Sequence, residues 1–275
     1  MKLSIGHKSA AVAFTAAAMG VSTLFLGAAP ASAAGVCGTH GKLVSGNICE
    51  RTYTKVGKAT FTPNSHMTHL QVLLVAGGGA GSTGNEGYSA AGGGGEVKVV
   101  GFDGDTTTQL KLVVGGSGGS STAAEGATTY TADAGESDFY EEAGESGNDN
   151  PGWADTVSDG YGGGGGASVT GHGTPVNAFD GGAGATAASV APSGSLFLND
   201  KKCYGGGGAS ALPNTKAGVA TCGGGYAKGV ILLHNVAPKA NTGGGGAGWY
   251  TSFSRGLDHE GASGVIVVRW NAPKH

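Results

Sequence analysis

The stretch HLQVLLVAGGGAGSTG, residues 69–84, joins a short apolar run directly to a cluster of glycines. Gly79, Gly81 and Gly84 match the dinucleotide-binding pattern G-x-G-x-x-G, and Asp103 follows at about the distance of the ribose-binding acid in such sites. A dinucleotide site also needs a helix directly after the glycines, because the helix amino terminus holds the pyrophosphate. The residues that follow, NEGYSAAGGGGEVKVV, are rich in glycine and carry no apolar stripe. We therefore interpret the stretch as a strand that leads into a structure built from glycine.

Glycine dominates the whole chain, with 58 glycines among 275 residues, about three times the usual share. Collagen is excluded, because the glycines follow no G-X-Y period and there are only 8 prolines. The glycines instead gather into blocks, and the sequence GGGGAS occurs twice. The blocks are Gly77–Gly79, Gly92–Gly95, Gly162–Gly166, Gly205–Gly208, Gly223–Gly225 and Gly243–Gly246.

Two interpretations of these blocks remain open from the residues alone. Extended threefold helices of the polyproline II type make no internal hydrogen bonds. If several such helices pack side by side, their backbone groups can pair between helices, and only glycine permits that close approach on every side. The other interpretation is that the blocks are flexible loops.

The remaining regular structure is expected to be β. Five segments have the β-branched content and the twofold alternation of strands, a sixth is weaker, and no segment forms a convincing amphipathic helix. The five are Leu70–Val75, Glu96–Phe102, Gln109–Val114, Gly229–His234 and Gly264–Trp270, and the sixth is Lys55–Phe61. We therefore predict an all-β fold, in which β-sandwich strands flank a packed polyglycine II bundle with long display loops.

Residues 1–33 have the features of a secretory signal peptide. Lys2 and Lys8 precede an alanine-rich apolar run, and Ala31-Ser32-Ala33 fits an A-x-A cleavage site. We expect a secreted protein, extracellular or associated with the cell surface, with no integral membrane segment once the signal is removed. The rest divides into an N-terminal segment, residues 34–59, and a glycine-rich β domain, residues 60–275.

The four cysteines, Cys37, Cys49, Cys203 and Cys222, are expected to form disulfides, as is usual in secreted proteins. Four cysteines allow three pairings. The local pairing, Cys37 with Cys49 and Cys203 with Cys222, is favoured, and the other two stay open. A zinc site is disfavoured because the C-x-x-C spacing is absent.

The charge pattern argues against nucleic acid as a partner, because there is no lysine or arginine between Lys111 and Lys201. The stretch 133–159 holds nine carboxylates and no cation. Oxygen-rich segments with glycine turns can bind calcium, so Asp149, Asp155 and Asp159 are candidate ligands. The alternative is a solvated acidic loop with no cofactor.

Catalytic motifs are weak. Gly115–Gly119, GGSGG, matches the G-x-S-x-G of hydrolases, but a nucleophile elbow requires a helix behind Ser117 and the following residues are poor helix formers. A secreted hydrolase is therefore the least favoured hypothesis. We expect no enzyme and no catalytic residues.

Several segments resemble the bacterial and phage glycine-rich domain family over about residues 60–270. They are HLQVLLVAGGGAG, GGGGEVKVV, LKLVVGGSGG, GYGGGGGAS and GASGVIVVRW. The resemblance implies a β-sandwich with a polyglycine II bundle, as found on phage tail-fibre tips and in secreted or surface bacterial proteins. It also implies a role in recognition or as a scaffold, without shared catalytic residues. The acidic stretch 133–159 and the four cysteines depart from the family pattern.

Aromatic residues between the glycine blocks are the candidate ligand-binding residues, since exposed aromatics suit carbohydrate or protein contact. They are Phe139, Tyr140, Trp153, Trp249, Tyr250 and Phe253, with Phe179 as a further display residue. The favoured function is an adhesion or binding module for an extracellular glycan or protein. The alternative is a structural protein of the cell envelope or matrix that associates with itself through its glycine surfaces.

Overall fold

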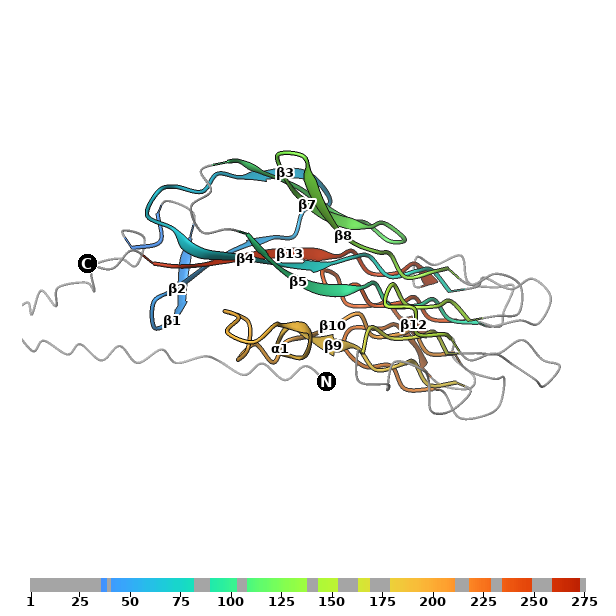
Figure 1. The fold of residues 1–275 in the computed structure, drawn as a ribbon. Helices are drawn as coiled ribbons and strands as arrows, with labels where there is room; N and C mark the ends of the chain where they lie inside the picture. Colours follow the sequence, from blue (N-terminus) through green and yellow to red (C-terminus); the bar gives the residue numbers. More distant parts are fainter. Residues whose placement is uncertain are drawn as a thin grey trace, which may run out of the picture. The chain divides into compact units, whose positions relative to one another are not determined.

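The structure is a computed structural model that describes residues 36–38, 41–81, 90–102, 108–137, 143–152, 163–168, 179–210, 218–228, 234–248 and 259–272. Two antiparallel sheets dominate this part of the chain, and a set of glycine runs continues from the ends of their strands (Figure 1). The predicted all-β class is confirmed. None of the helices in these ranges has the length and apolar character that a membrane crossing requires. The predicted signal peptide lies outside the described residues.

The first sheet has five strands in the order β1-β2-β13-β4-β5. The strands are β1 Lys42–Ser45, β2 Ile48–Tyr53, β13 Val265–Asn271, β4 Thr68–Val75 and β5 Val97–Phe102. The last long strand of the chain thus lies between two strands from its first third. Because β2 pairs with β13 over six residues, the described part of the predicted N-terminal segment is built into this sheet.

The second sheet has four strands in the order β3-β6-β7-β8 and packs on one face of the first. Its strands are β3 Gly57–Phe61, β6 Leu110–Val114, β7 Ser121–Glu125 and β8 Thr128–Ala132. Ring pairs join the two sheets: Phe61 lies 5.3 Å from Trp270, and Phe102 lies 5.4 Å from Tyr130, measured between centroids. The two sheets therefore form a sandwich.

Strands β4 and β13 are buried on both faces, which explains why they are continuous apolar runs rather than alternating ones. Val72, Leu74 and Val268 face the sandwich core. Leu73 and Val267 face the opposite way, into a second core. The five-stranded sheet is thus the middle layer of this part of the molecule.

The segment 187–204 covers the outer face of the five-stranded sheet. It begins with one helical turn, α1 Ala187–Val190, and Phe197 and Tyr204 fill the second core. Two strand pairs complete the fold: β9 Ala185–Thr186 with β10 Cys203–Tyr204, and β11 Tyr226–Lys228 with β12 His234–Val236. We call residues 191–202, which include Phe197, the strap.

The favoured disulfide pairing is confirmed. Cys37 bonds to Cys49, and Cys203 bonds to Cys222. The first bond attaches the start of the described chain to β2, and the second attaches β10 to a glycine run. Both agree with an extracellular location, where disulfides persist.

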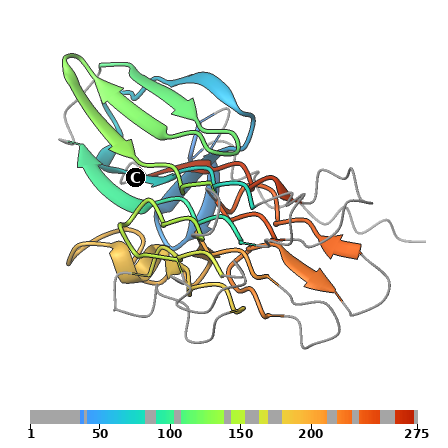
Figure 2. The ribbon, with the colours of Figure 1, turned by 90° about the vertical axis from the view of Figure 1, so that its right-hand side faces the viewer.

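The glycine runs lie side by side beyond the sheets, and Figure 2 shows runs from distant parts of the sequence next to each other. We call them together the glycine bundle. Its described members are residues 76–81, 90–96, 133–137, 143–147, 163–168, 179–184, 205–210, 218–225, 243–248 and 259–264.

Every third N–H of the central run, residues 90–96, donates to the same neighbouring run. Gly92 and Gly95 donate to the carbonyls of Gly246 and Gly243, at 3.0 and 2.8 Å. The residues between and after them donate to two other runs, and these bonds are Gly93 to Glu136, Gly94 to Gly165 and Glu96 to Asp133. The backbone therefore turns by about a third of a revolution per residue.

The carbonyl groups of the central run accept from three further runs. The donors are Gly79 and Ala76 from the first run, Gly144 and Gly147 from the fourth, and Gly208 from the seventh. The central run thus has six neighbours, three through its N–H groups and three through its carbonyls. The backbone groups that a strand would pair with two neighbours are here distributed among six.

The strands expected from apolar pattern are found with small shifts at their ends. Leu70–Val75, Glu96–Phe102, Gln109–Val114 and Gly264–Trp270 correspond to β4, β5, β6 and β13, and the weaker Lys55–Phe61 corresponds to β3. Of Gly229–His234, residues 229–233 lie outside the described part. Strands β7 and β8, which were not predicted, form between β6 and the glycine blocks from small and polar residues.

Candidate functional site

The predicted ligand-binding aromatics lie outside the described residues. They are Phe139, Tyr140, Trp153, Trp249, Tyr250 and Phe253, within the ranges 138–142, 153–162 and 249–258. Phe179, the further display residue, is described and half-buried, and its carbonyl accepts from the N–H of Ser210 at 2.9 Å. Described residues flank these three ranges, among them Ser137, Gly152 and Gly248.

Those flanking residues come together at one end of the glycine bundle. Gly81 donates its N–H to the carbonyl of His259 at 2.7 Å, and Gly248 donates to Ala209 at 3.2 Å. The N–H of Ala80 donates to the hydroxyl of Ser137 at 3.1 Å. We call the residues Gly81, Ser137, Ala143, Gly152, Gly248 and His259 the bundle end.

Close backbone packing holds the bundle end in place. A Cβ atom built on Gly79 or on Gly144 would fall within 3.0 Å of the carbonyl oxygen of Glu136, closer than real Cβ atoms approach. A Cβ atom on Gly152 would meet Ala143 in the same way. Glycine is therefore required at these positions, and the flanking residues have little freedom to shift relative to one another.

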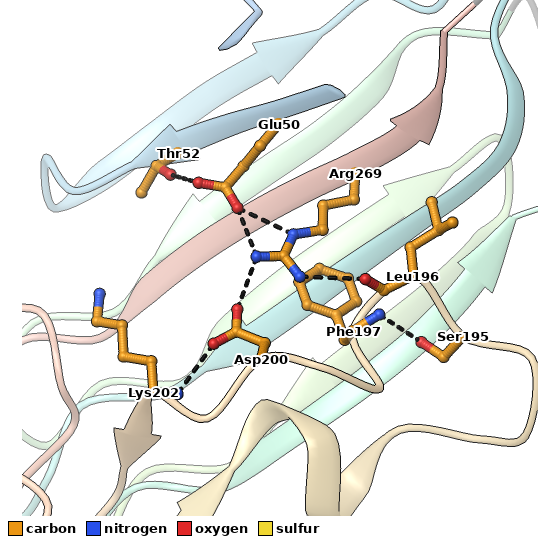
Figure 3. Close-up of polar contacts among 8 residues, drawn as sticks. All are labelled: Glu50, Thr52, Ser195, Leu196, Phe197, Asp200, Lys202 and Arg269. Atoms are coloured by element: carbon orange, nitrogen blue, oxygen red, sulfur yellow. Dashed lines mark hydrogen bonds and ion pairs between the residues drawn. The ribbon is translucent and has the colours of Figure 1, made fainter. Parts of the chain in front are cut away.

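A polar cluster fixes the strap on the outer face of the five-stranded sheet (Figure 3). The Nη2 atom of Arg269 lies 2.7 Å from a carboxylate oxygen of Glu50 and 2.7 Å from one of Asp200. The Nη1 atom donates to the carbonyl of Leu196 at 3.1 Å, and the guanidinium carbon lies 4.4 Å from the centroid of the Phe197 ring. One cation thus joins strand β2 to the strap.

A second set of hydrogen bonds holds the strap to β4. The carboxamide oxygen of Gln71 accepts from the hydroxyl of Ser195 at 2.7 Å and from the N–H of Leu196 at 2.8 Å. A ring nitrogen of His69 lies 3.2 Å from the carbonyl oxygen of Gly194. His69 has a φ of 55°, where the strand departs from regular geometry. Together with the Arg269 cluster, these contacts make the strap a fixed part of the scaffold.

Tyr204 lies between the strap and the glycine bundle, and its pKa is raised well above the usual range of a phenol. Burial is the largest cause, followed by the negative charges of Asp200 and Glu50. Arg269 acts in the opposite direction and lowers the pKa of Tyr204. The phenol stays neutral at any physiological pH and has no acid–base role there.

The described amides of the dinucleotide motif are already paired within the protein. Gly79 donates its N–H to the carbonyl of Gly93 at 2.8 Å, and Gly81 donates to His259 at 2.7 Å. A pyrophosphate site would need these amides unpaired. Gly84 and Asp103 lie outside the described residues.

The hydrolase motif also lacks its structural context. GGSGG at Gly115–Gly119 forms the turn between β6 and β7, and strand β7 follows where an elbow requires a helix. Ser117 is exposed on this turn. No residue was predicted to be catalytic, Ser117 included.

Of the candidate calcium ligands, only Asp149 is described. It lies in a turn with φ of 59°, and its N–H donates to the carbonyl of Ser146 at 2.9 Å. Within the described ranges no three acidic, histidine or cysteine side chains group closely enough to hold a metal ion. Asp155 and Asp159 lie outside these ranges, so the calcium site stays a prediction.

Sequence reasoning missed the strap and its polar cluster. The signal was Arg269, a single cation inside the apolar run VIVVRW. A charge in a strand that is buried on both faces needs a carboxylate partner. The partners, Glu50 and Asp200, lie far from Arg269 in sequence, and no sequence pattern identifies them as its partners.

Comparison with known proteins found one family. A model described as a glycine-rich domain matches residues 53–271, from the end of β2 to the end of β13. The matched part therefore contains both sheets except β1 and most of β2, together with the described glycine bundle. No curated protein matches the chain.

Proposed function

Because the chain belongs to the glycine-rich domain family, we propose that it is a secreted, non-enzymatic binding module. In this proposal the sandwich and the glycine bundle form a rigid scaffold. The scaffold presents recognition segments to a glycan or protein on a cell surface, without a cofactor.

The observation that carries the proposal is the clustering of the flanking residues at the bundle end. Five described residues that flank the three ranges with the candidate aromatics lie at that end: Ser137, Ala143, Gly152, Gly248 and His259. A binding surface made from several chain segments needs their ends close together and held in place. Tight glycine packing supplies both conditions at this end.

We further propose that the glycine runs are polyglycine II helices. The threefold period of donors in the run 90–96, and its six neighbours, support this assignment. Helices of this type make no internal hydrogen bonds, so a neighbour in every direction satisfies the backbone.

The same hydrogen bonds favour a binding module over a protein that associates through its glycine surfaces. The central run uses its N–H and carbonyl groups on neighbours from its own chain. Light scattering over a hundredfold range of concentration separates the two functions: we expect a constant monomer mass, and a mass that grows with concentration would favour the structural protein.

Glycan-array and cell-surface binding tests examine the module directly. We expect that Trp153→Ala and Trp249→Ala each weaken binding by about tenfold, because a buried aromatic contact commonly contributes 1–2 kcal/mol at an interface. The matched control is Tyr130→Ala, an aromatic that packs against Phe102 in the sandwich and lies away from the bundle end. Unchanged binding by both tryptophan variants would remove the display role.

A further inference from the structure

A pocket of about 370 Å³ opens at the rim of the sandwich, at the end away from the glycine bundle. Its walls include Arg51, Phe61, Thr62, Asn64, Met67 and Trp270. Several of these residues lie in the segment 61–67, just before β4 begins at Thr68. Strand β4 then leads to the bundle at Ala76 (Figure 1). Eight residues of strand span about 26 Å, so the pocket is separate from the bundle end.

Arg51 faces into the sandwich rather than away from it. It pairs across the sheet with Val268, whose side chain belongs to the sandwich core, and residues directly opposite each other in a sheet share a face. Its neighbours on that face of β2 are Cys49 and Tyr53, which pair with the core residues Trp270 and Ile266. The guanidinium is thus placed among core residues, at the open rim.

The charge of Arg51 has no counter-ion in the part of the chain that the structure describes. Its ring contact is with Tyr53, whose centroid lies 5.0 Å from the guanidinium carbon. Burial raises the pKa of Tyr53 and Arg51 lowers it by a smaller amount, so the phenol is neutral at physiological pH. No carboxylate lines the described pocket. The Tyr53 ring orients the guanidinium without neutralising it.

Two further donors are available beside Arg51. The hydroxyl oxygen of Thr62 accepts from the carboxamide of Gln109 at 3.2 Å, which leaves the hydroxyl hydrogen to donate elsewhere. The carboxamide oxygen of Asn64 accepts from the N–H of His66 at 3.0 Å, which leaves its NH₂ group to donate. A fixed cation and two donors of this kind match the oxygens of a carboxylate and neighbouring hydroxyls.

We infer that this pocket binds an acidic monosaccharide unit, a hexuronate. The carboxylate would pair with the guanidinium of Arg51, and the ring hydroxyls would accept from Thr62 and Asn64. The volume lies within the range of small-ligand pockets and suits one sugar ring. Met67, which is partly buried, lines the pocket with the buried rings of Phe61 and Trp270 behind it, and gives a sugar ring an apolar contact.

The test is a titration of the full secreted chain at low ionic strength with three probes: glucuronate, glucose and glutamate. We expect glucuronate to bind with millimolar affinity or better, and the other two to bind at least tenfold more weakly. Glucose has the same ring without the carboxylate, and glutamate has a carboxylate without the sugar ring. Equal binding of glucose would overturn the role of Arg51, equal binding of glutamate would overturn the sugar class, and no binding of any probe would overturn the site.

Arg51→Met keeps most of the apolar stem and removes the charge, so it should weaken glucuronate binding at least tenfold. The control Lys58→Met removes an exposed cation from strand β3 of the four-stranded sheet and should bind as the parent does. If Arg51→Met does not fold, Thr62→Val, at an exposed position, serves instead and should weaken binding severalfold. Binding that both Arg51→Met and Thr62→Val leave unchanged would overturn the assignment. Trp153→Ala and Trp249→Ala should bind glucuronate as the parent does, because the described residues next to them, Gly152 and Gly248, lie at the bundle end.

Discussion

Gly94 packs so closely against Gly205 that a Cβ atom on Gly94 would fall within 3.0 Å of the carbonyl oxygen of Gly205. Gly94 lies in the central run of the bundle, and its N–H donates to Gly165 at 2.8 Å. The contact is between two backbones, so no side chain can rotate away to make room. This relationship explains why the bundle is built from glycine.

We expect Gly94→Ala to lower the free energy of unfolding by about 3 kcal/mol, because a methyl group would force two backbones apart. The matched control is Gly101→Ala in strand β5, where a Cβ atom meets nothing within 4 Å. That substitution should be neutral or stabilise the protein by up to about 1 kcal/mol. Denaturant unfolding of both variants measures the difference, and equal stabilities would contradict the packing described here.

Hydrogen exchange should follow the bonding of the central run. The N–H groups of Gly92 to Gly95 each donate to a neighbouring run, and these glycines are buried. We expect their amides to exchange as slowly as those of the central strand β13. Exchange within seconds at neutral pH would show that the run is not held by these bonds.

Removal of the Cys203–Cys222 disulfide should destabilise the protein by about 3 kcal/mol, since the bond closes a loop of 19 residues in the unfolded chain. The double variant Cys203→Ser/Cys222→Ser tests this by thermal unfolding. Peptide mapping of the oxidised parent supplies the control for connectivity. A fragment that joins Cys37 to Cys203 would contradict both bonds.

Replacement of Arg269 by methionine should cost about 3 kcal/mol, because it leaves two carboxylates unpaired at mostly buried positions. The side chains of Glu50 and Asp200 are 21% and 14% exposed. The matched control is Lys111→Met, since Lys111 is an exposed cation of strand β6 with no ion pair among the described residues, and this loss should be within about 1 kcal/mol. Similar losses from the two variants would mean that the strap does not depend on its ion pairs.

Alkaline pH should destabilise the protein through Tyr204. Because the pKa of Tyr204 is raised in the folded state, the unfolded chain loses its phenolic proton first, near pH 10. Stability is unaffected by this group below that pH and falls as pH rises above it, by up to about 1.4 kcal/mol per pH unit. In Tyr204→Phe this part of the alkaline loss should disappear in unfolding curves taken from pH 9 to 11.5. An unchanged alkaline slope would contradict the assignment.

The sequence predicted β4 and β13 well. A strand that is buried on both faces is a continuous apolar run, which can be recognised without knowledge of the strands it pairs with. The sequence predicted β7 and β8 poorly. The sequences STAAE and TTYTA are small and polar, and the tight turn between them at Gly126, with φ of 56°, became clear only from the structure. The cysteine pairing was favoured correctly because both bonds are local.

The ligand-binding aromatics lie outside the described residues, so their role stays a prediction. The pattern placed the aromatics between glycine blocks, and the described flanking residues converge at the bundle end. The rim pocket was not predicted at all. Arg51 appears in the sequence as one more charge in a weak strand, and only the pairing of β2 with β13 turns it toward the core.

By itself, the sequence determined that glycine would be used in blocks and that strands would lead into those blocks, and it favoured the local cysteine pairing that the structure then confirmed. The tertiary structure alone decided which blocks are neighbours. The blocks are nearly identical in sequence, so no local pattern can distinguish one partner from another. The sheets set the order of the runs, because β4, β5, β8 and β13 are each continuous with one glycine run and fix its position. The other runs pair with the N–H and carbonyl groups that these four leave available.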